Sequence, residues 1–279
     1  MRHRPLFLII LFCLAATLSA QKQPEKKSKS ENLIKNGNLE KGDDGKTPRH
    51  WANFDGLTAR WEKTGGNPGR FLLLDTTVLK SDKKLMDTDA EAFEKKGRSQ
   101  KEGHYDSVGA SQGAWAFAAP IDVKPSDTYF ILSADVSASK PSSEMEYPMV
   151  LIRGFKKITA ETAGQNKSWF HEHFNDGVGY SDVFGSKDLY RDSREGDYLQ
   201  VYRKSLFCRN PQINQWRHFE VGFKLPTINK FRPDRILIKP YAFWPPGHYR
   251  FDNLSLRRAT KAEVDAVNAK IPSIKEVLK

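Results

Sequence analysis

The sequence predicts an antiparallel β-sandwich followed by a short C-terminal helix. From Leu33 onward, many segments alternate apolar and polar residues with a period of two, which is typical of half-buried strands. Pro, Gly, Asn and Asp separate these segments, and no helices alternate with them, which favours an all-β antiparallel sandwich or barrel. With 279 residues, 38% hydrophobic and 28% charged, the chain can bury a core but is too polar for an integral membrane protein.

The first segment, Met1–Ala20, has the layout of a secretory signal. Arg2 and Arg4 precede an apolar run from Leu6 to Leu18, and small residues follow. The run is too short to span a membrane. We therefore expect an exported protein, periplasmic, cell-surface or extracellular, without a transmembrane segment once the signal is removed. Loss of the two arginines lowers the formal net charge from +11 to +9.

A basic tether is predicted next, at residues 21–31. This stretch has four lysines and no aliphatic or aromatic residue, so burial of apolar surface cannot repay the entropy of ordering it. Much of the positive charge therefore belongs to this tether rather than to the surface of the folded domain. Together with export, this argues against a nucleic-acid partner.

The predicted sandwich spans residues 32–258 and contains nine or ten strands. The segments are Leu57–Trp61, Phe71–Leu74, Trp115–Val123, Phe130–Val136, Met149–Phe155, Tyr198–Phe207, Phe219–Phe223, Ile236–Tyr241 and Tyr249–Leu256. Two insertions interrupt them. The first, near 81–104, is balanced in charge and is expected to be a solvated loop or short surface helix, whereas the second, near 158–197, is rich in aromatic residues and is expected to be functional.

A helical tail is predicted at residues 259–279. Thr260 followed by Glu263 forms a capping box, which starts a helix at Lys261 that should end near Ala269. Cys208 is left without a partner once the signal, which contains Cys13, is removed. We expect Cys208 to be a buried structural thiol rather than a nucleophile.

Three motifs carry a resemblance to a known family. They are Asn32–Glu40 (NLIKNGNLE), Val123–Tyr129 (VKPSDTY) and Gly247–Leu256 (GHYRFDNLSL). Together they resemble the carbohydrate-binding modules with a galactose-binding-like jelly roll, the group that includes families four, nine and twenty-two. Tyr105–Ala110 (YDSVGA) and Tyr241–Gly247 (YAFWPPG) also resemble segments of exported bacterial proteins of planctomycete type, which implies a source but no activity. The resemblance to the carbohydrate-binding modules implies a jelly-roll sandwich and non-catalytic binding of a polysaccharide or glycan.

The same resemblance implies a structural calcium site. In modules of this type the first and last strands lie side by side, and the acidic residues of their motifs contribute to it; by position these are Glu40 and Asp252. The apolar parity of the last strand changes at Asp252 and Asn253, which predicts a one-residue bulge there. The alternative is that Glu40 and Asp252 make only hydrogen bonds or a salt bridge.

Sugar binding needs flat aromatic rings beside hydrogen-bonding groups. Trp115, Trp169 and Trp244 lie near turns and are our candidate ligand-binding rings, although each could instead pack in the core or an interface. Arg153, on a predicted strand, could bind an acidic glycan or be a solvated or paired residue. Trp61 and Trp216 are assigned to the core because they lie in alternating segments.

Two other functions stay open. The same fold could serve as a structural or protein-interaction module of the bacterial cell envelope, with the aromatic insertion docked on a partner. A polysaccharide-degrading enzyme is a further alternative, resting on His171, His173 and Asp176, which could form a facial metal site. We predict no catalytic residues, because a solvated surface loop explains these histidines better and no zincin or phosphate-loop motif occurs.

Overall fold

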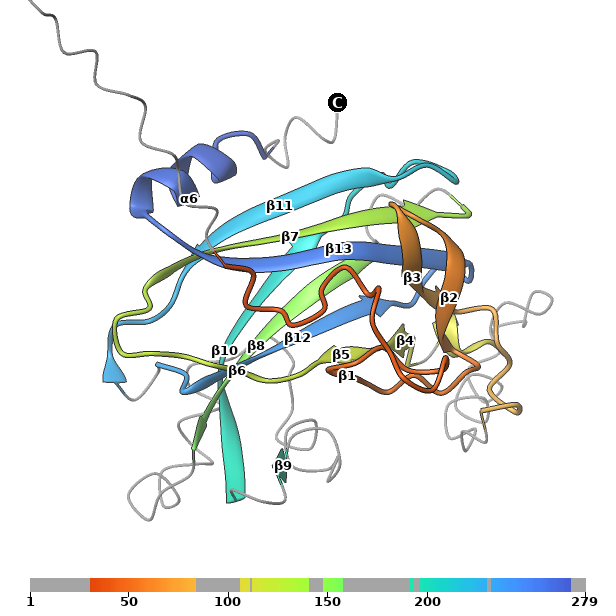
Figure 1. The fold of residues 1–279 in the computed structure, drawn as a ribbon, viewed down its shortest axis with the longest axis horizontal. Coiled ribbons are helices and arrows are strands. Elements are labelled where there is room, and N and C mark those ends of the chain that lie inside the picture. Colours follow the sequence, from red (N-terminus) through yellow and green to blue (C-terminus); the bar gives the residue numbers. More distant parts are fainter. Residues whose placement is uncertain are drawn as a thin grey trace, which may run out of the picture. The chain divides into compact units, whose positions relative to one another are not determined.

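The computed structural model describes residues 31–83, 106–110, 112–140, 148–157, 191–192, 196–229 and 232–271. All of them belong to one compact unit, Glu31–Lys279, which is built as an antiparallel β-sandwich jelly roll, as expected (Figure 1). The signal at 1–20, nearly all of the tether and most of both insertions lie outside these residues. Within the part of the chain that is described, no helix is long and apolar enough to cross a membrane.

The first sheet has five strands in the order β11-β7-β13-β3-β2. Their bounds are β2 Ala59–Gly66, β3 Gly69–Asp75, β7 Tyr129–Ala138, β11 Arg217–Lys224 and β13 His248–Ala259. The second sheet has the order β4-β12-β8-β10-β9, with β6 also paired to β12. Its strands are β4 Ala114–Trp115, β6 Ile121–Asp122, β8 Met149–Lys157, β9 Arg191–Asp192, β10 Gly196–Phe207 and β12 Arg235–Ala242.

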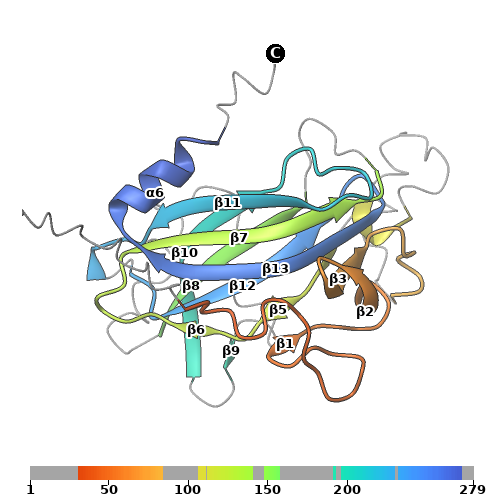
Figure 2. The same ribbon diagram turned by 45° about the horizontal axis from the view of Figure 1, so that its top comes forward.

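The core lies between these two sheets (Figure 2). Strand β7 shows how the sequence builds it: Phe130, Leu132, Ala134 and Val136 are buried on one face, as their period of two predicts. The opposite sheet contributes alternate residues of β8, β10 and β12 in the same way. Trp61 and Cys208 are also buried here, which confirms both assignments, and burial raises the pKa of the Cys208 thiol.

Three strand predictions need correction. Leu57 lies outside β2, because the Asp55 carboxylate accepts the N–H groups of Leu57 and Ala59 and holds a turn before the strand. The segment Trp115–Val123 is not one strand but β4, β5 (Phe117–Ala118) and β6. It changes partners: β4 and β6 pair with β12, while β5 pairs with β1 (Trp51–Ala52).

Trp216 is the third correction, since it is not a core residue. It lies just before β11, is half-exposed, and donates its indole N–H to the Gly65 carbonyl at 3.3 Å. Its ring meets Phe71 edge to face. The turn preceding it contains Asn214 in the left-handed region, with φ 54°, so the strand starts later than the alternation suggested.

The last strand carries the predicted bulge. The register of β13 against β7 shifts between Asp252 and Ser255, and Asn253 has φ 49°. The motif near the N-terminus runs alongside this strand but is turn rather than strand. It is held by bonds from Leu33 N to Leu256 O (2.8 Å) and from Leu254 N to Gly37 O (2.8 Å).

Helix α6 (Lys261–Asn268) confirms the predicted helix and its capping box. The Thr260 side chain accepts the Glu263 N–H, and the Glu263 carboxylate accepts the Thr260 N–H. Val264 and Val267 pack on Ile131, so the helix covers one end of the outer face of the first sheet (Figure 1). The remainder of the tail, from residue 272, lies outside the described residues.

Candidate functional site

The outer face of the second sheet gathers aromatic and basic side chains. In β12, Ile236 and Ile238 enter the core, so Leu237, Lys239 and Tyr241 project to the other side. Residues paired directly across antiparallel strands share a face. Tyr241 pairs with Trp115 of β4, and Leu237 pairs with Arg153 of β8, so both candidate residues project from this same face. We call it the aromatic face. Its members are Trp115, Phe117, Arg153, Gln200, Lys239, Tyr241 and the adjoining Phe243.

Three half-buried rings adjoin one another at its edge. The Trp115 and Tyr241 ring centroids are 6.4 Å apart, and those of Tyr241 and Phe243 are 5.8 Å apart with an interplanar angle of 26°. None of the three is fully covered. The result is a contiguous aromatic surface partly open to solvent.

Lys239 lies beneath this surface with only 7% of its area exposed. Its Nζ is 4.4 Å from the Trp115 ring centroid, 5.1 Å from that of Tyr241 and 5.4 Å from that of Phe117. The attraction between an ammonium and ring faces strengthens when both are desolvated. Lys239 therefore fixes the orientation of the three rings.

Polar groups flank the rings. Arg153 Nη1 donates to Gln200 Oε1 at 3.2 Å, and both side chains are buried. The Trp115 indole N–H is also buried and has no hydrogen-bond partner in the described part of the chain. Tyr241 donates its hydroxyl to the Gln112 carbonyl at 3.1 Å. Burial raises the pKa of Tyr241, against the opposing charges of Arg153 and Arg203, so it stays a neutral donor at physiological pH.

The structure thus brings together two of the four predicted ligand-binding residues, Trp115 and Arg153. Trp244 lies half-buried in the loop after β12, beyond Phe243, and Trp169 lies outside the described residues. Lys239, Tyr241 and Phe243 were missed by sequence reasoning. Lys239 and Tyr241 alternate along β12 and Phe243 follows just after its end, so a spacing of two was the available signal, but the register of β4 against β12 was not readable from it.

The two predicted metal ligands lie near the β13 bulge. Glu40 Oε1 accepts the Arg70 N–H at 2.8 Å. Asp252 is fully buried, and its carboxylate accepts the N–H groups of Asn67 (2.6 Å) and Asn253 (2.7 Å). Burial, together with the charges of Glu40 and Asp135, raises the pKa of Asp252 to about 6. Among the described residues, no three His, Cys, Asp or Glu side chains are arranged to hold a metal ion.

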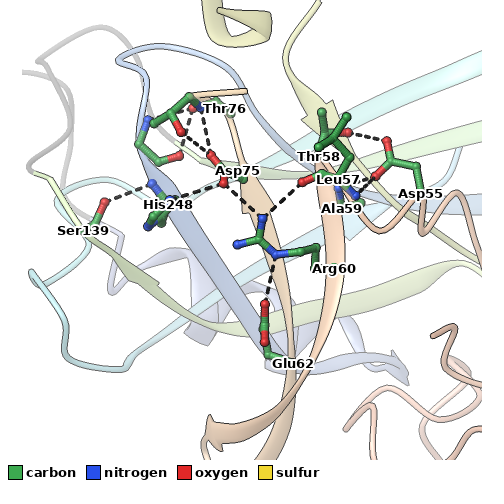
Figure 3. Close-up of polar contacts among 12 residues, drawn as sticks. Asp55, Leu57, Thr58, Ala59, Arg60, Glu62, Asp75, Thr76, Ser139 and His248 are labelled. Atoms are coloured by element: carbon green, nitrogen blue, oxygen red, sulfur yellow. Dashed lines mark hydrogen bonds and ion pairs between the residues drawn. The ribbon is translucent and has the colours of Figure 1, made fainter. Parts of the chain in front are cut away.

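A second polar cluster, around Asp75, is fully occupied by protein groups (Figure 3). The Asp75 carboxylate is buried and faces Arg60 Nη1 at 3.2 Å and His248 Nε2 at 3.3 Å. It also accepts the N–H and hydroxyl of Thr77, at 3.0 and 2.6 Å. These contacts tie β2, β3 and β13 together, so the cluster is a structural junction rather than a binding site.

Residues Gly109–Gly113 spell the letters G-x-S-x-G of a hydrolase nucleophile motif. That motif requires a strand leading through a sharp turn into a helix. Here the pentapeptide begins in the 3₁₀ turn Val108–Ala110 and leads into β4, and Ser111 lies outside the described residues. The described residues on either side of Ser111 therefore do not form the strand, turn and helix of a nucleophile elbow.

Comparison with known proteins gives structural similarities alone. The sequence matches no protein-family model and no curated protein. A family 16 carbohydrate-binding module is 14% identical with a TM-score of 0.38, over 81% of this chain and 99% of that one. A family 61 module solved with β-1,4-galactotriose is 9% identical with a TM-score of 0.35, over 82% and 100%. A putative sugar-binding protein from Bacteroides thetaiotaomicron is 10% identical with a TM-score of 0.38, over 82% and 100%.

Proposed function

We propose that this chain is a non-catalytic carbohydrate-binding protein that recognises a polysaccharide or glycan on the aromatic face. The observation that carries the proposal is the contiguous run of half-buried rings Trp115, Tyr241 and Phe243, edged by buried hydrogen-bonding groups. Sugars present apolar C–H surfaces beside hydroxyl groups, and this face offers a counterpart to each.

Binding would divide between stacking and hydrogen bonding. The rings supply flat apolar surface, and Lys239 already fixes the orientation of Trp115 and Tyr241, so little side-chain entropy of these two rings is lost on binding. The Trp115 N–H is a buried donor without a hydrogen-bond partner among the described residues, so a sugar hydroxyl that accepts it would remove the cost of leaving it unpaired. The guanidinium of Arg153, which donates to Gln200 Oε1, adds positive charge to this face and with it a preference for acidic sugars.

Affinity gel electrophoresis against a panel of neutral and acidic polysaccharides tests the proposal. Trp115→Ala and Tyr241→Ala should abolish the retardation of the wild-type chain. Trp216→Ala is the matched control, because Trp216 is half-exposed on the other sheet and should leave retardation unchanged. Thermal melts of each variant separate loss of binding from loss of folding. Equal retardation of Trp115→Ala and wild type on every ligand would contradict the proposal.

The protein-interaction alternative gives a distinct result in the same screen. If no polysaccharide retards the wild-type chain and an envelope protein co-purifies with it, the chain is a structural or protein-interaction module of the cell envelope instead. We place either activity outside the cytoplasm, a proposal supported by the signal-like segment Met1–Ala20.

We also propose that calcium stabilises the fold beside the β13 bulge. The supporting observation is that the Asp252 carboxylate accepts the Asn67 N–H and the Glu40 carboxylate accepts the Arg70 N–H, so two acidic side chains that repel each other lie at the same turn between β2 and β3. Carboxylate oxygens suit calcium, which would offset this repulsion and do no chemistry. Calcium should raise the melting temperature of the wild type, and Asp252→Asn should lose that increase. An unchanged melting temperature after chelation, with no calcium found by elemental analysis, would contradict the proposal.

A further inference from the structure

A cleft of about 610 Å3 opens at one edge of the sandwich, away from the aromatic face. Its walls come from the end of β10, the first residues of β11, and helix α6 with the residues that follow it. Its floor is apolar, made by Leu206, Val221 and Val267. Phe207, 48% exposed, and Ile271, 44% exposed, border it as well. Both are large apolar side chains that solvent reaches.

The cleft is lined by the free edge of the first sheet. Strand β11 is the terminal strand of that sheet, with β7 on one side and no strand on the other among the described residues. At Gly222 the outer edge is already occupied: Gly222 N–H donates to Asn268 Oδ1 at 2.9 Å, and Asn268 Nδ2 donates to Gly222 O at 3.1 Å. The Asn268 side chain of α6 therefore makes the two hydrogen bonds that one residue of a neighbouring strand would make.

The backbone of His218 and Glu220 faces the same way as that of Gly222. In an antiparallel strand, alternate residues direct both N–H and C=O to the same side. Since Gly222 directs both toward Asn268, His218 and Glu220 direct theirs into the cleft. Such a row of donors and acceptors can template one more strand.

The charged side chains that border the cleft indicate which kind of peptide strand would bind there. The ionisable residues that line the cleft, apart from His218, are Lys204, Arg209, Arg217, Lys270 and Glu220. His218 contacts Asp135 at 2.7 Å, and Glu220 is 3.7 Å from Lys270. Among the described residues that line the cleft, Glu220 offsets Lys270, and Lys204 and Arg217 still leave the rim with a net positive charge, which favours an anionic occupant.

We propose that this edge binds an acidic peptide segment of a partner protein, in extended conformation, as an added strand on β11. The acidic side chains would face the Lys204 and Lys270 rim, and alternate apolar side chains would contact the floor and Phe207. A polysaccharide would use the basic rim but not the regular backbone row, so the observations favour peptide. This site is independent of the carbohydrate proposal.

The probe is a fluorescent heptapeptide with alternating Glu and Val, titrated with the full chain and followed by anisotropy. Lys204→Glu combined with Lys270→Glu should weaken binding at least tenfold. The control pair Lys46→Glu and Lys63→Glu changes net charge equally on exposed lysines outside the cleft and should not weaken it. A Lys/Val heptapeptide should not bind.

Backbone pairing is tested separately. Glu220→Pro removes an N–H that faces the cleft and should abolish binding, since proline is tolerated on an edge strand but cannot donate. Lys224→Pro, beyond Gly222 on the same strand, is the control. N-methylation of the probe residues whose N–H groups face β11 should abolish binding to the wild type. Methylation of the alternate residues should not. This test does not require a proline variant that folds.

Three results would overturn the proposal. Binding insensitive to both methylation patterns would rule out strand addition, and binding of polygalacturonate in place of the peptide would make the cleft an acidic-glycan site. If neither probe binds, the basic side chains around the cleft serve only to prevent aggregation of the exposed sheet edge. Trp115→Ala should not affect the peptide, so failure here is distinguishable from failure of the carbohydrate proposal.

Discussion

The ammonium of Lys239 lies 4.4 Å from the ring centroid of Trp115. A buried lysine thus lies over one face of the tryptophan on the candidate sugar-binding face. One face of the indole is occupied by this cation, so a ligand must approach the exposed remainder of the ring.

Lys239→Ala should destabilise the fold by about 2–3 kcal/mol, because it removes a desolvated cation–π contact and the packing of the stem. Lys239→Arg retains the charge and should cost less. Urea unfolding measures both, and the emission maximum of Trp115 should shift in the alanine variant. Wild-type stability of Lys239→Ala would show that the contact contributes nothing.

Asp75→Ala should cost about 3 kcal/mol, since it leaves the partners of a buried carboxylate unsatisfied. His248→Ala serves as the comparison. That imidazole is partly exposed, so its removal should cost less than about 1 kcal/mol. Chemical denaturation of the two variants gives the difference, and equal costs would contradict the assignment of Asp75 as the centre of the junction.

His218 should make stability depend on pH. Its hydrogen bond to Asp135 raises its pKa, against the lowering effect of burial, so the folded state binds the proton more tightly than the unfolded state. The contribution is complete below the unfolded value near 6.5 and is lost as pH rises through the higher folded value. Because the imidazole is largely exposed, we expect about 0.5–1 kcal/mol.

His218→Gln should therefore be less stable than the wild type at pH 5.5 and equal to it at pH 9. Thermal melts at the two pH values provide the measurement. A constant difference across this range would show that the variant acts through packing rather than protonation.

Asp127 should account for part of the loss of folding stability at acidic pH. Burial alone would raise its pKa, but hydrogen bonds from Arg258 and the Lys124 N–H outweigh burial and hold the pKa below its ordinary value. The stabilisation is present above the unfolded value and is lost as pH falls through the lower folded value. Asp127→Asn should be less stable than wild type at pH 6, and this deficit should narrow below pH 3.

The sequence predicted the sandwich because a period of two marks strands wherever one face is buried, as in Phe130–Val136. It could not locate strand ends fixed by turns, which is why Leu57 and Trp216 were misassigned. In the site, Trp115 and Arg153 were predictable as an aromatic and a charged residue near strands. Lys239 was not, because a buried lysine depends on rings brought from β4 and β5 by long-range pairing.

The bonds between the two ends of the sandwich bear on how the chain folds. Asn32 donates from Nδ2 to Leu254 O at 3.0 Å, and its Oδ1 accepts the Leu256 N–H at 3.0 Å, across 222 and 224 residues of sequence. During synthesis, these contacts cannot form until the last strand has left the ribosome. Such distant pairing slows folding, so the emerging chain stays incomplete for most of its translation. The contact between the two ends of the sandwich is therefore one of the last that the chain can form.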